Sequence, residues 1–368
     1  MPSSLPTLPL RGKPQQMGLT RRPGRVMMGS MTSRHSPPHT AALTMACLLV
    51  AMMWPGPSRL HAAATSVPVL EGSARIWDEA PHNAFTDLIR FHGEWLCVFR
   101  EGQAHVSPDG ALRVIASGDG KSWRSKARLT HPKADLRDAK ISLGPDGRLF
   151  LTGAAAWHPP NPARHLTLAW RSMNGTDWGE PFSIGETNQW LWRVTTHRKE
   201  MWGVGYATEG DKITRLYRSR NGKDFQTWIP AFFKEGYPNE TALRFLPDDT
   251  MVCLLRRDQP PHTGQLGRSR PPYKEWEWKD LKQRIGGPNF LILPDQRAYA
   301  VVRLYDDKVR TSLCRLDVEN GTLKEALVLP SGGDTSYAGM VWHEERLWIS
   351  YYSSHEGKTA IYLAVVRL

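Results

Sequence analysis

The sequence predicts an all-β fold in which one antiparallel hairpin recurs along the chain. An apolar strand, a tight polar turn and a second apolar strand follow one another six times, with turns centred near Gly93, Asp146, Lys199, Asp248, Asp295 and Glu344. Successive centres are 47 to 53 residues apart. Repeats of this length, built from short strands, are typical of propeller blades. We therefore expect a six-bladed β-propeller of four-stranded antiparallel blades.

A second motif runs in phase with the hairpins and supports the same repeat. The stretches SGDGKSW (Ser117 to Trp123), SMNGTDW (Ser172 to Trp178) and SRNGKDF (Ser219 to Phe225) share the pattern S-x-[DN]-G-x-[SD]-[WF]. The Asp-Gly or Asn-Gly pair favours a tight turn. The aromatic residue that follows is expected to be largely buried between neighbouring blades. Degenerate versions occur at SRPPYKEW and DVENGTL.

The first 64 residues differ from the rest and are predicted to be a secretory leader, so that the propeller domain covers 65–368. They hold seven basic residues and no acidic one, and they contain an apolar run of 14 residues from Ala41 to Trp54. A membrane-spanning helix needs roughly 20 residues. The small residues at 62–64 fit a signal-peptidase site. We expect a secreted or periplasmic protein that is not stably inserted in a membrane after cleavage, with an uncleaved anchor as the alternative.

Charge and cysteine usage exclude several other classes of protein. The whole chain carries a formal charge of +12, but removal of the leader leaves 41 basic and 36 acidic residues. This balance gives little support for nucleic-acid binding. Cys97, Cys253 and Cys314 each lie within an apolar strand, which indicates buried thiols and not a disulfide framework. Neither C-x-x-C nor H-E-x-x-H spacing occurs, so we predict no metal and no cofactor.

Polar residues that flank the six hairpins are predicted to gather on one face of the molecule. In a hairpin the start of the first strand lies beside the end of the second. Before the first strands stand Asp87, Arg137, Asp138, Trp192, Arg193, Asn239, Glu240, Asn289 and Asp334 to Tyr337; after the second strands stand Arg100, Glu101, Trp157, Glu209, Arg256, Arg257, Asp258, Arg303 to Asp306 and Ser353 to Glu356. Arginine clusters bind carboxylates through paired donors, so an anionic partner is expected here.

Three segments on this face resemble the sialidase superfamily, and the resemblance extends over nearly the whole predicted domain. They are NETALRFLPDDTMVCLLRR, RLYDDKVRTSL and GGDTSYAGMVWHEERLWISYY. The serine motifs likewise resemble the Asp-box repeats of that superfamily, one residue shorter. The resemblance implies that Tyr337 is a catalytic nucleophile and Glu240 its base. It also implies substrate-binding arginines at Arg256, or Arg257 if the register shifts by one, and at Arg310 or Arg303.

The sequence departs from the superfamily in the first blade. The family opens this blade with an arginine in an R-I-P run, where this chain has AFTDLI. Arg100 and Arg137 are the candidates to replace that arginine. A general acid is expected in the loop REGQAHVSPDGAL, where Asp109 is nearest by spacing. The competing residues are Glu101, His105 and Asp87.

Three functions are compatible with these features. The first is a secreted exo-glycosidase that hydrolyses terminal sialic acid, or a related acidic sugar, from a glycan or glycoconjugate. A phenol suits this reaction because a carboxylate nucleophile would be repelled by the carboxylate on the anomeric carbon. The second is a propeller glycosidase of different sugar specificity, and the third is a non-catalytic glycan-binding propeller. The pairing of Tyr337 with Glu240 favours an enzyme, and it requires the two side chains to converge near the propeller axis.

Overall fold

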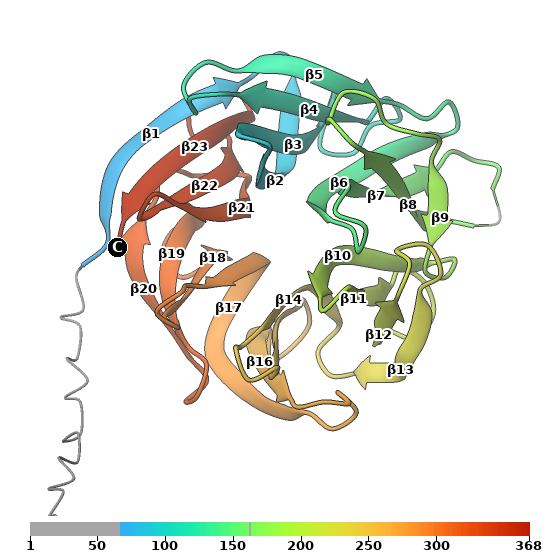
Figure 1. The fold of residues 1–368 in the computed structure, drawn as a ribbon, viewed down its shortest axis with the longest axis vertical. Helices are drawn as coiled ribbons and strands as arrows, with labels where there is room; N and C mark the ends of the chain where they lie inside the picture. The colour runs from blue at the N-terminus through green and yellow to red at the C-terminus, as the bar shows by residue number, and fades with distance from the viewer. Residues whose placement is uncertain (1–66, 162) are drawn as a thin grey trace, which may run out of the picture. The chain divides into compact units, whose positions relative to one another are not determined.

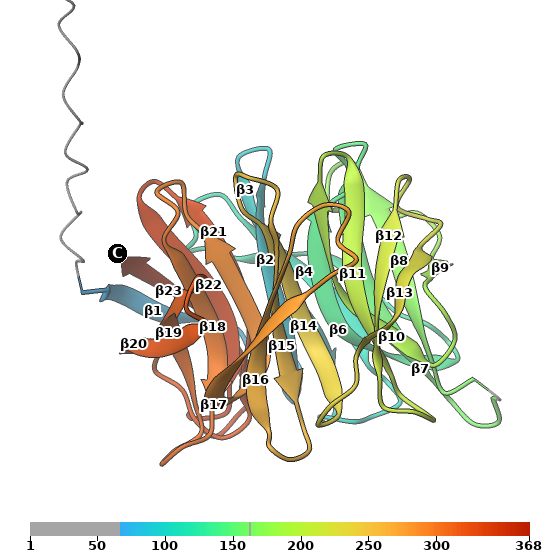
Figure 2. The same ribbon diagram turned by 90° about the horizontal axis from the view of Figure 1, so that it is seen from below.

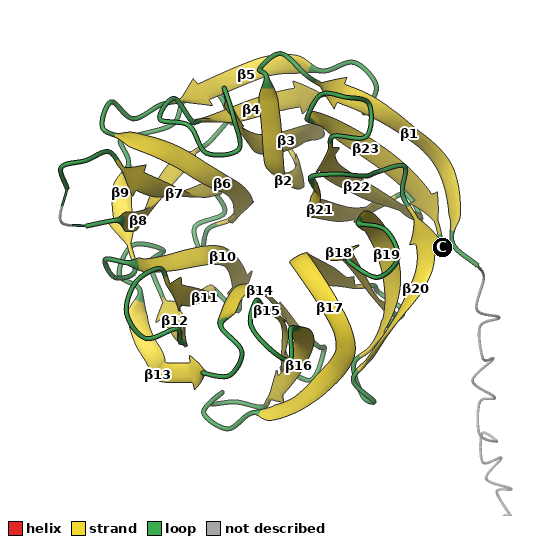
Figure 3. Ribbon diagram, turned by 180° about the vertical axis from the view of Figure 1, so that it is seen from behind, coloured by secondary structure: helices red, strands yellow, loops and turns green. Residues whose placement is uncertain are grey.

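A computed structural model describes residues 67–161 and 163–368. The predicted leader, 1–64, lies outside the described residues. All regular secondary structure in the described residues is β-strand (Figure 3). No helix that could cross a membrane is present in this part of the chain.

The described strands are short, and most contain six to ten residues. In chain order they are β1 (Val69–Trp77), β2 (His82–Phe91), β3 (Glu94–Gly102), β4 (Ala111–Ser117), β5 (Arg124–Leu129), β6 (Ala134–Leu143), β7 (Leu149–Trp157), β8 (His165–Ser172), β9 (Phe182–Ile184), β10 (Gln189–His197), β11 (Glu200–Ala207), β12 (Thr214–Ser219), β13 (Gln226–Phe233), β14 (Pro238–Phe245), β15 (Met251–Arg257), β16 (Thr263–Ser269), β17 (Glu277–Ile292), β18 (Ala298–Leu304), β19 (Arg310–Asp317), β20 (Thr322–Val328), β21 (Thr335–His343), β22 (Arg346–Ser353) and β23 (Ala360–Arg367).

The strands form antiparallel sheets arranged around a central axis (Figure 1). Four sheets have four strands and one has seven. The seven-stranded sheet is continuous because β17 pairs with β16 through residues 277–284 and with β18 through residues 285–292. Seen from the side, the innermost strands run along the axis (Figure 2). The prediction of an all-β protein built from four-stranded antiparallel units is confirmed for these sheets.

Each of the six predicted hairpins is present, as β2–β3, β6–β7, β10–β11, β14–β15, β17–β18 and β21–β22. Several turn residues between these strands have the positive φ that tight hairpin turns require, for example Gly93 at 82° and Lys199 at 63°. The first strand of each hairpin lies nearest the central axis, and in the seven-stranded sheet both β14 and β17 reach this position (Figure 1). The hairpins therefore fix which residues can reach the axis.

The ring of sheets is closed by two strands from opposite ends of the described chain. Strand β1 pairs with β23 from Val69 opposite Arg367 to Trp77 opposite Ile361. The sheet order is β1-β23-β22-β21, so the first described strand forms the outer edge of the last sheet (Figure 1, blue beside red). This closure leaves no gap between the first and last hairpins, which hold Phe85 and Tyr337 within contact of each other.

The three serine motifs adopt equivalent turns, as predicted. They connect β4 to β5, β8 to β9 and β12 to β13. In each, the serine Oγ accepts a hydrogen bond from the glycine N–H three residues later, at 2.8 Å for Ser117, 2.8 Å for Ser172 and 3.0 Å for Ser219. The side chain thus substitutes for a backbone acceptor within the turn.

The aromatic residues of these motifs are less buried than predicted. Trp123, Trp178 and Phe225 are half-buried, although each packs against a hydrophobic core. The indole N–H groups of the two tryptophans donate to the carbonyls of Gly120 and Gly175, at 3.2 and 3.0 Å. These bonds hold each indole over its own turn, so one edge stays in solvent.

The three predicted cysteine thiols are free and buried. Burial raises the pKa of the Cys314 thiol to about 12. The pKa of Cys253 is also raised by burial. A thiol in this state is a poor nucleophile, so these residues contribute to packing.

Candidate active site

Every innermost strand carries a β-bulge at the same place, close to its beginning. The pairing register shifts between Ala84 and Asp87, Arg137 and Lys140, Leu191 and Arg193, Pro238 and Thr241, Gly286 and Asn289, and Ser336 and Gly339. A bulge inserts an extra residue and changes the direction of its side chain. We call the residues inserted here the bulge ring: Phe85, Asp138, Trp192, Glu240, Gly287 and Tyr337.

Tyr337 and Glu240 are hydrogen-bonded across the bulge ring. The Tyr337 hydroxyl donates to Glu240 Oε1 and accepts a bond of 3.1 Å from Arg256 Nη1. Glu240 Oε2 accepts from Arg256 at 2.7 Å and from the Gly287 N–H at 2.9 Å. Both Tyr337 and Glu240 are only 7% exposed. The predicted convergence of these two side chains is confirmed, while their catalytic roles remain predictions.

The surroundings of this pair favour a neutral phenol beside an ionised carboxylate. Burial would raise the pKa of Glu240, but the charge of Arg256 and the bonds from Tyr337, Arg256 and Gly287 outweigh it, and the pKa lies below its ordinary value. Burial, followed by the charge of Glu240, raises the pKa of Tyr337 well above its ordinary value. The proton therefore resides on the phenol, and ionised Glu240 accepts its hydrogen bond.

Asp138 is a second carboxyl group of the bulge ring. It is 6% exposed, and its Oδ2 accepts a bond of 3.1 Å from the Trp192 indole. Burial raises the pKa of Asp138; Lys140 and Arg137 oppose this shift, and the charge of Glu240 adds to it. The two carboxyl groups thus have pKa values displaced in opposite directions, which is the usual arrangement of an acid and a base in one site. The sequence placed Asp138 on this face but gave no signal for its role.

A buried cation lies beside the bulge ring. Lys140 Nζ contacts the carbonyl oxygens of Ala139, Phe85 and Thr86 at 3.1 to 3.4 Å. It lies 5.1 Å from the centre of the Trp192 ring. Burial lowers the pKa of Lys140 to about 8. Its charge offsets the nearby carboxylates.

Two ring members shape the space around Tyr337. A Cβ on Gly287 would lie 2.7 Å from Tyr337 Cδ2, so only glycine allows this close approach. Phe85 meets the Tyr337 ring edge-to-face at a centroid distance of 5.1 Å. Phe85 occupies the part of the first blade where the family resemblance would place an arginine. The ring member of the first sheet is therefore aromatic and uncharged.

Three arginines surround the ring. Arg256 is bonded to the pair itself, and the Arg303 guanidinium lies 5.4 Å from the Tyr337 ring centre while donating to Tyr352 and Asp334. Arg137 lies over Phe85 at 5.7 Å, and its buried Nε has no hydrogen-bond partner. Of the two candidates to replace the missing arginine, the structure thus places Arg137 beside the ring.

Arg100 was predicted to bind substrate, but the structure shows it completely buried. Its Nε donates to Asp135 at 2.9 Å, and its Nη atoms donate to Ala104 and Ser107. Its exposed fraction is 0%. Arg100 therefore anchors the loop between β3 and β4, because a buried guanidinium needs its donors satisfied within the protein.

Arg257 and Arg310, which were also predicted to bind substrate, both make internal contacts. Arg257 is buried and donates to Thr263 and, at 2.8 Å, to Asp280. Neighbouring residues of a strand face opposite sides, so Arg257 points away from the pair that Arg256 contacts. Arg310 is paired with Glu325 and Asp306 at 2.8 and 2.9 Å.

The structure also argues against Asp109 as the general acid. It is exposed, and its Oδ1 accepts a bond from the Gln103 N–H at 3.2 Å. Slight burial would raise the pKa of Asp109, but hydrogen bonds from Ser107 and Gln103 lower it overall. A general acid must hold a proton. Pro-Asp-Gly at this point is a turn that closes the loop.

The alternative acids are likewise engaged elsewhere. Glu101 is paired with Arg113 and Arg128, Asp87 with Arg193, and His105 with Asp334. Asp138 is therefore the carboxyl group of the bulge ring that best fits a general acid, because its pKa is raised.

The sequence matches no protein-family model and no curated protein, but solved structures share its fold. A Dyadobacter fermentans protein of unknown function aligns with a TM-score of 0.71 and 21% identity, over 82% of this chain and 99% of that one. The GH93 α-L-arabinofuranosidase of Fusarium graminearum, in complex with arabinobiose, gives 0.65 and 13%, over 81% and 98%. Trypanosoma rangeli sialidase gives 0.62 and 11%, over 81% and 60%. At these identities the likeness establishes the fold.

Proposed function

We propose that this protein is a glycoside hydrolase whose reaction centre is the bulge ring of a six-bladed propeller. The observation that carries the proposal is the buried hydrogen bond between Tyr337 and Glu240, with Asp138 in the same ring. A glycan-binding protein has no need of a phenol bonded to a carboxylate and of a second carboxyl group with a raised pKa. The propeller glycosidases that share the fold make this chemistry plausible for the scaffold.

In the proposed reaction, Asp138 protonates the glycosidic oxygen as the bond to the leaving group breaks. Tyr337 attacks the anomeric carbon while its proton passes to Glu240. Water then releases the sugar from Tyr337, as Asp138, now ionised, takes a proton from that water and Glu240 returns its proton to the phenol oxygen. The protein ends in its starting state.

The finer proposal is a terminal sugar with a carboxylate, of which sialic acid is the model. It is supported by Arg137, Arg256 and Arg303 around the ring, and by the free buried Nε of Arg137. A guanidinium N–H without a partner is a donor for which a substrate oxygen would be a natural acceptor.

A neutral sugar is the second candidate, because each arginine already lies beside a protein carboxylate. The pairs are Arg256 with Glu240 and Asp258 at 2.7 and 2.8 Å, Arg303 with Asp334 at 3.0 Å, and Arg137 with Asp135 at 3.7 Å. Their positive charge is therefore largely neutralised before any substrate binds. The fold likeness to an arabinofuranosidase crystallised with arabinobiose suggests which neutral sugar to test first.

A screen of fluorogenic glycosides tests the proposal. We expect hydrolysis of at least one substrate among α-sialosides and α-L-arabinofuranosides, and loss of that hydrolysis in Tyr337→Phe. The sialoside would identify the anionic class and the arabinofuranoside the neutral one. Binding of the free sugars without turnover of any glycoside in a wider panel would contradict the enzyme and support a glycan-binding propeller.

The rate should depend on pH through the two carboxyl groups. Glu240 acts when ionised, which holds above its lowered pKa, and Asp138 acts when protonated, which holds below its raised pKa. We therefore expect a bell-shaped profile of kcat/KM with its maximum between those two values. Asp138→Asn should remove the alkaline limb and should impair poor leaving groups most, because activated aryl leaving groups need no proton. An alkaline limb that persists in this variant would assign the acid to another residue.

We also propose that residues 1–64 direct export and are removed, which would place the enzyme where extracellular glycans occur. The basic flank, the apolar run of 14 residues and the small residues at 62–64 support this. The mass of the exported protein tests it.

A further inference from the structure

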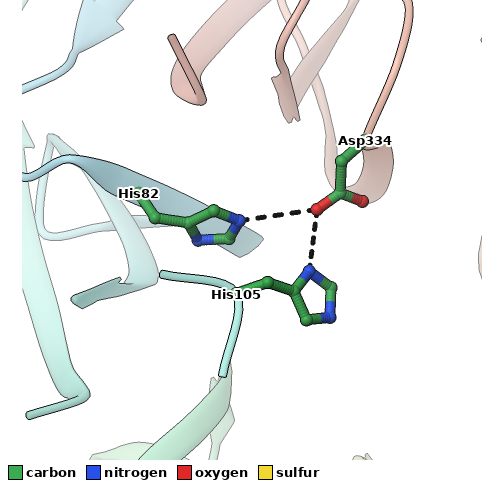
Figure 4. A group of neighbouring side chains, drawn as sticks. All are labelled: His82, His105 and Asp334. Carbon is green, nitrogen blue, oxygen red and sulfur yellow. Dashed lines mark hydrogen bonds and ion pairs between the residues drawn. The ribbon is translucent and has the colours of Figure 1, made fainter. Parts of the chain in front are cut away.

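Two histidines and an aspartate from three separate segments meet beside the candidate active site (Figure 4). His82 lies at the start of β2, His105 in the loop between β3 and β4, and Asp334 just before β21. Asp334 Oδ2 lies 3.4 Å from His82 Nε2 and 2.8 Å from His105 Nδ1. Both imidazoles thus direct one nitrogen at the same carboxylate oxygen.

The spacing of these three atoms suits a bound metal ion. All three lie within 4.8 Å of one another. An ion with bonds of about 2.0–2.2 Å to nitrogen and oxygen holds its ligand atoms roughly 3 to 3.5 Å apart. A small shortening of the longest of the three separations would bring the three ligand atoms to that spacing around a common centre.

The environment orients the carboxylate toward this centre. Asp334 Oδ1 accepts bonds from the Tyr352 hydroxyl at 2.6 Å and from Arg303 at 3.0 Å. Oδ2 is left to the two imidazoles. Hydrogen bonds from such a second layer of residues commonly orient metal ligands and strengthen their binding.

Solvent can reach the cluster from one side. The side chain of His82 is 10% exposed and that of Asp334 29%, whereas that of His105 is 51% exposed. An edge-to-face contact with Phe85, at 5.1 Å, supports the His105 ring. The ion could therefore enter past His105 and retain a water molecule as a further ligand.

We propose that His82, His105 and Asp334 form a binding site for a divalent transition-metal ion, with Zn²⁺ as the probe. Two imidazoles and one carboxylate favour zinc and its neighbours over calcium or magnesium, which prefer oxygen ligands. The site connects the β3–β4 loop to the segment that begins β21, and through Asp334 it contacts Arg303 of the candidate active site. The proposal does not depend on the proposed glycosidase function.

Calorimetric titration of untagged, chelator-treated protein with ZnCl₂ at neutral pH tests this site. We expect one ion per chain. His105→Ala, which removes the exposed ligand, should weaken binding by at least about tenfold, and Tyr352→Phe by about 10- to 100-fold through loss of the bond to Oδ1. His92→Asn is the matched control, because His92 is an exposed histidine in the β2–β3 turn, and it should bind as the wild type does.

The pH of the titration provides an independent check. Zinc binds the neutral imidazole and competes with protons for it, so the affinity should fall as the pH is lowered. The absence of stoichiometric binding by the wild type would overturn the proposal, as would equal affinity in His105→Ala and His92→Asn. In either case the three side chains form a hydrogen-bonded contact between three segments and nothing more.

Discussion

Glu240→Gln is expected to lower kcat by about 10²- to 10⁴-fold, the usual contribution of a positioned general base. Glutamine retains the shape of the side chain but cannot accept the Tyr337 proton. The pKa of Tyr337 is already raised by burial, so the phenol of the variant stays protonated and is a poor nucleophile. Arg256 keeps its contact with Asp258 at 2.8 Å, so the folded state should persist, which thermal unfolding can verify.

Tyr337→Phe tests which member of the pair, the Tyr337 phenol or the Glu240 carboxylate, attacks the sugar. If the phenol oxygen attacks the sugar, this variant loses activity as severely as Glu240→Gln. The matched control is Tyr351→Phe, which also removes a buried hydroxyl, one that donates to Pro330 at 2.9 Å outside the bulge ring. If Tyr337→Phe retains near-normal turnover while Glu240→Gln is inactive, the phenol is not the nucleophile. Glu240 itself would then be the reacting group.

Asp87→Ala is expected to reduce the free energy of unfolding by about 3–5 kcal/mol, the usual effect of removing one partner of a buried ion pair. Asp87 is buried, and its Oδ2 accepts bonds from Arg193 at 2.8 Å and from the Ile141 N–H at 3.0 Å. The carboxylate therefore joins the innermost strands of three successive sheets. Its loss would leave the buried Arg193 guanidinium without a carboxylate partner, with a bond of 3.4 Å to the Ala338 carbonyl remaining.

Denaturant unfolding of Asp87→Ala beside Asp146→Ala measures this effect. Asp146 pairs with Arg148 at 2.6 Å, but both side chains are substantially exposed. Exposed ion pairs contribute about 0–1 kcal/mol, so the control should be close to the wild type. Similar midpoints for the two variants would show that the Asp87–Arg193 pair is not a major source of stability.

The repeated features of the fold could be predicted from the sequence because they recur. Each hairpin has an apolar strand on either side of a polar turn. One such pattern is weak evidence for a hairpin, but six at a common spacing strongly indicate a repeat. That Tyr337 and Glu240 lie on one face followed from the same geometry, since both stand at the start of a first strand. Their pairing was implied by the resemblance to the sialidase superfamily. The sequence located the face of the molecule on which the ring lies.

The choice of residues within that face could not be predicted, because it depends on the bulges. A shift of one residue in a strand exchanges the side chains that face the axis for those that face away. Arg256 contacts Tyr337, whereas its neighbour Arg257 is paired with Asp280 on the other side. Asp138 was passed over for the same reason, because its place at the axis follows from a bulge at φ 52° that no local pattern indicates.

Contacts between distant segments were equally hidden. Arg100 and Arg137 are both arginines near strand ends. Arg100 is buried beneath the β3–β4 loop and bonded to Ala104, whereas Arg137 lies over Phe85. The contact of His82 and His105 with Asp334 joins residues more than 200 positions apart. Spacing motifs detect ligands that are close in sequence, so this cluster has no such signature.

The pairing of β1 with β23 has a consequence for how the chain is made. Val69 is among the first described residues to leave the ribosome, while its partner Arg367 is among the last. Throughout synthesis β1 lacks its native neighbour and is an unpaired strand edge, the kind of surface that promotes association with other chains. Successive hairpins can form as they emerge, but the ring can close only after β23 has been released. A nascent chain stalled anywhere before Ala360 would therefore keep this edge of β1 unpaired.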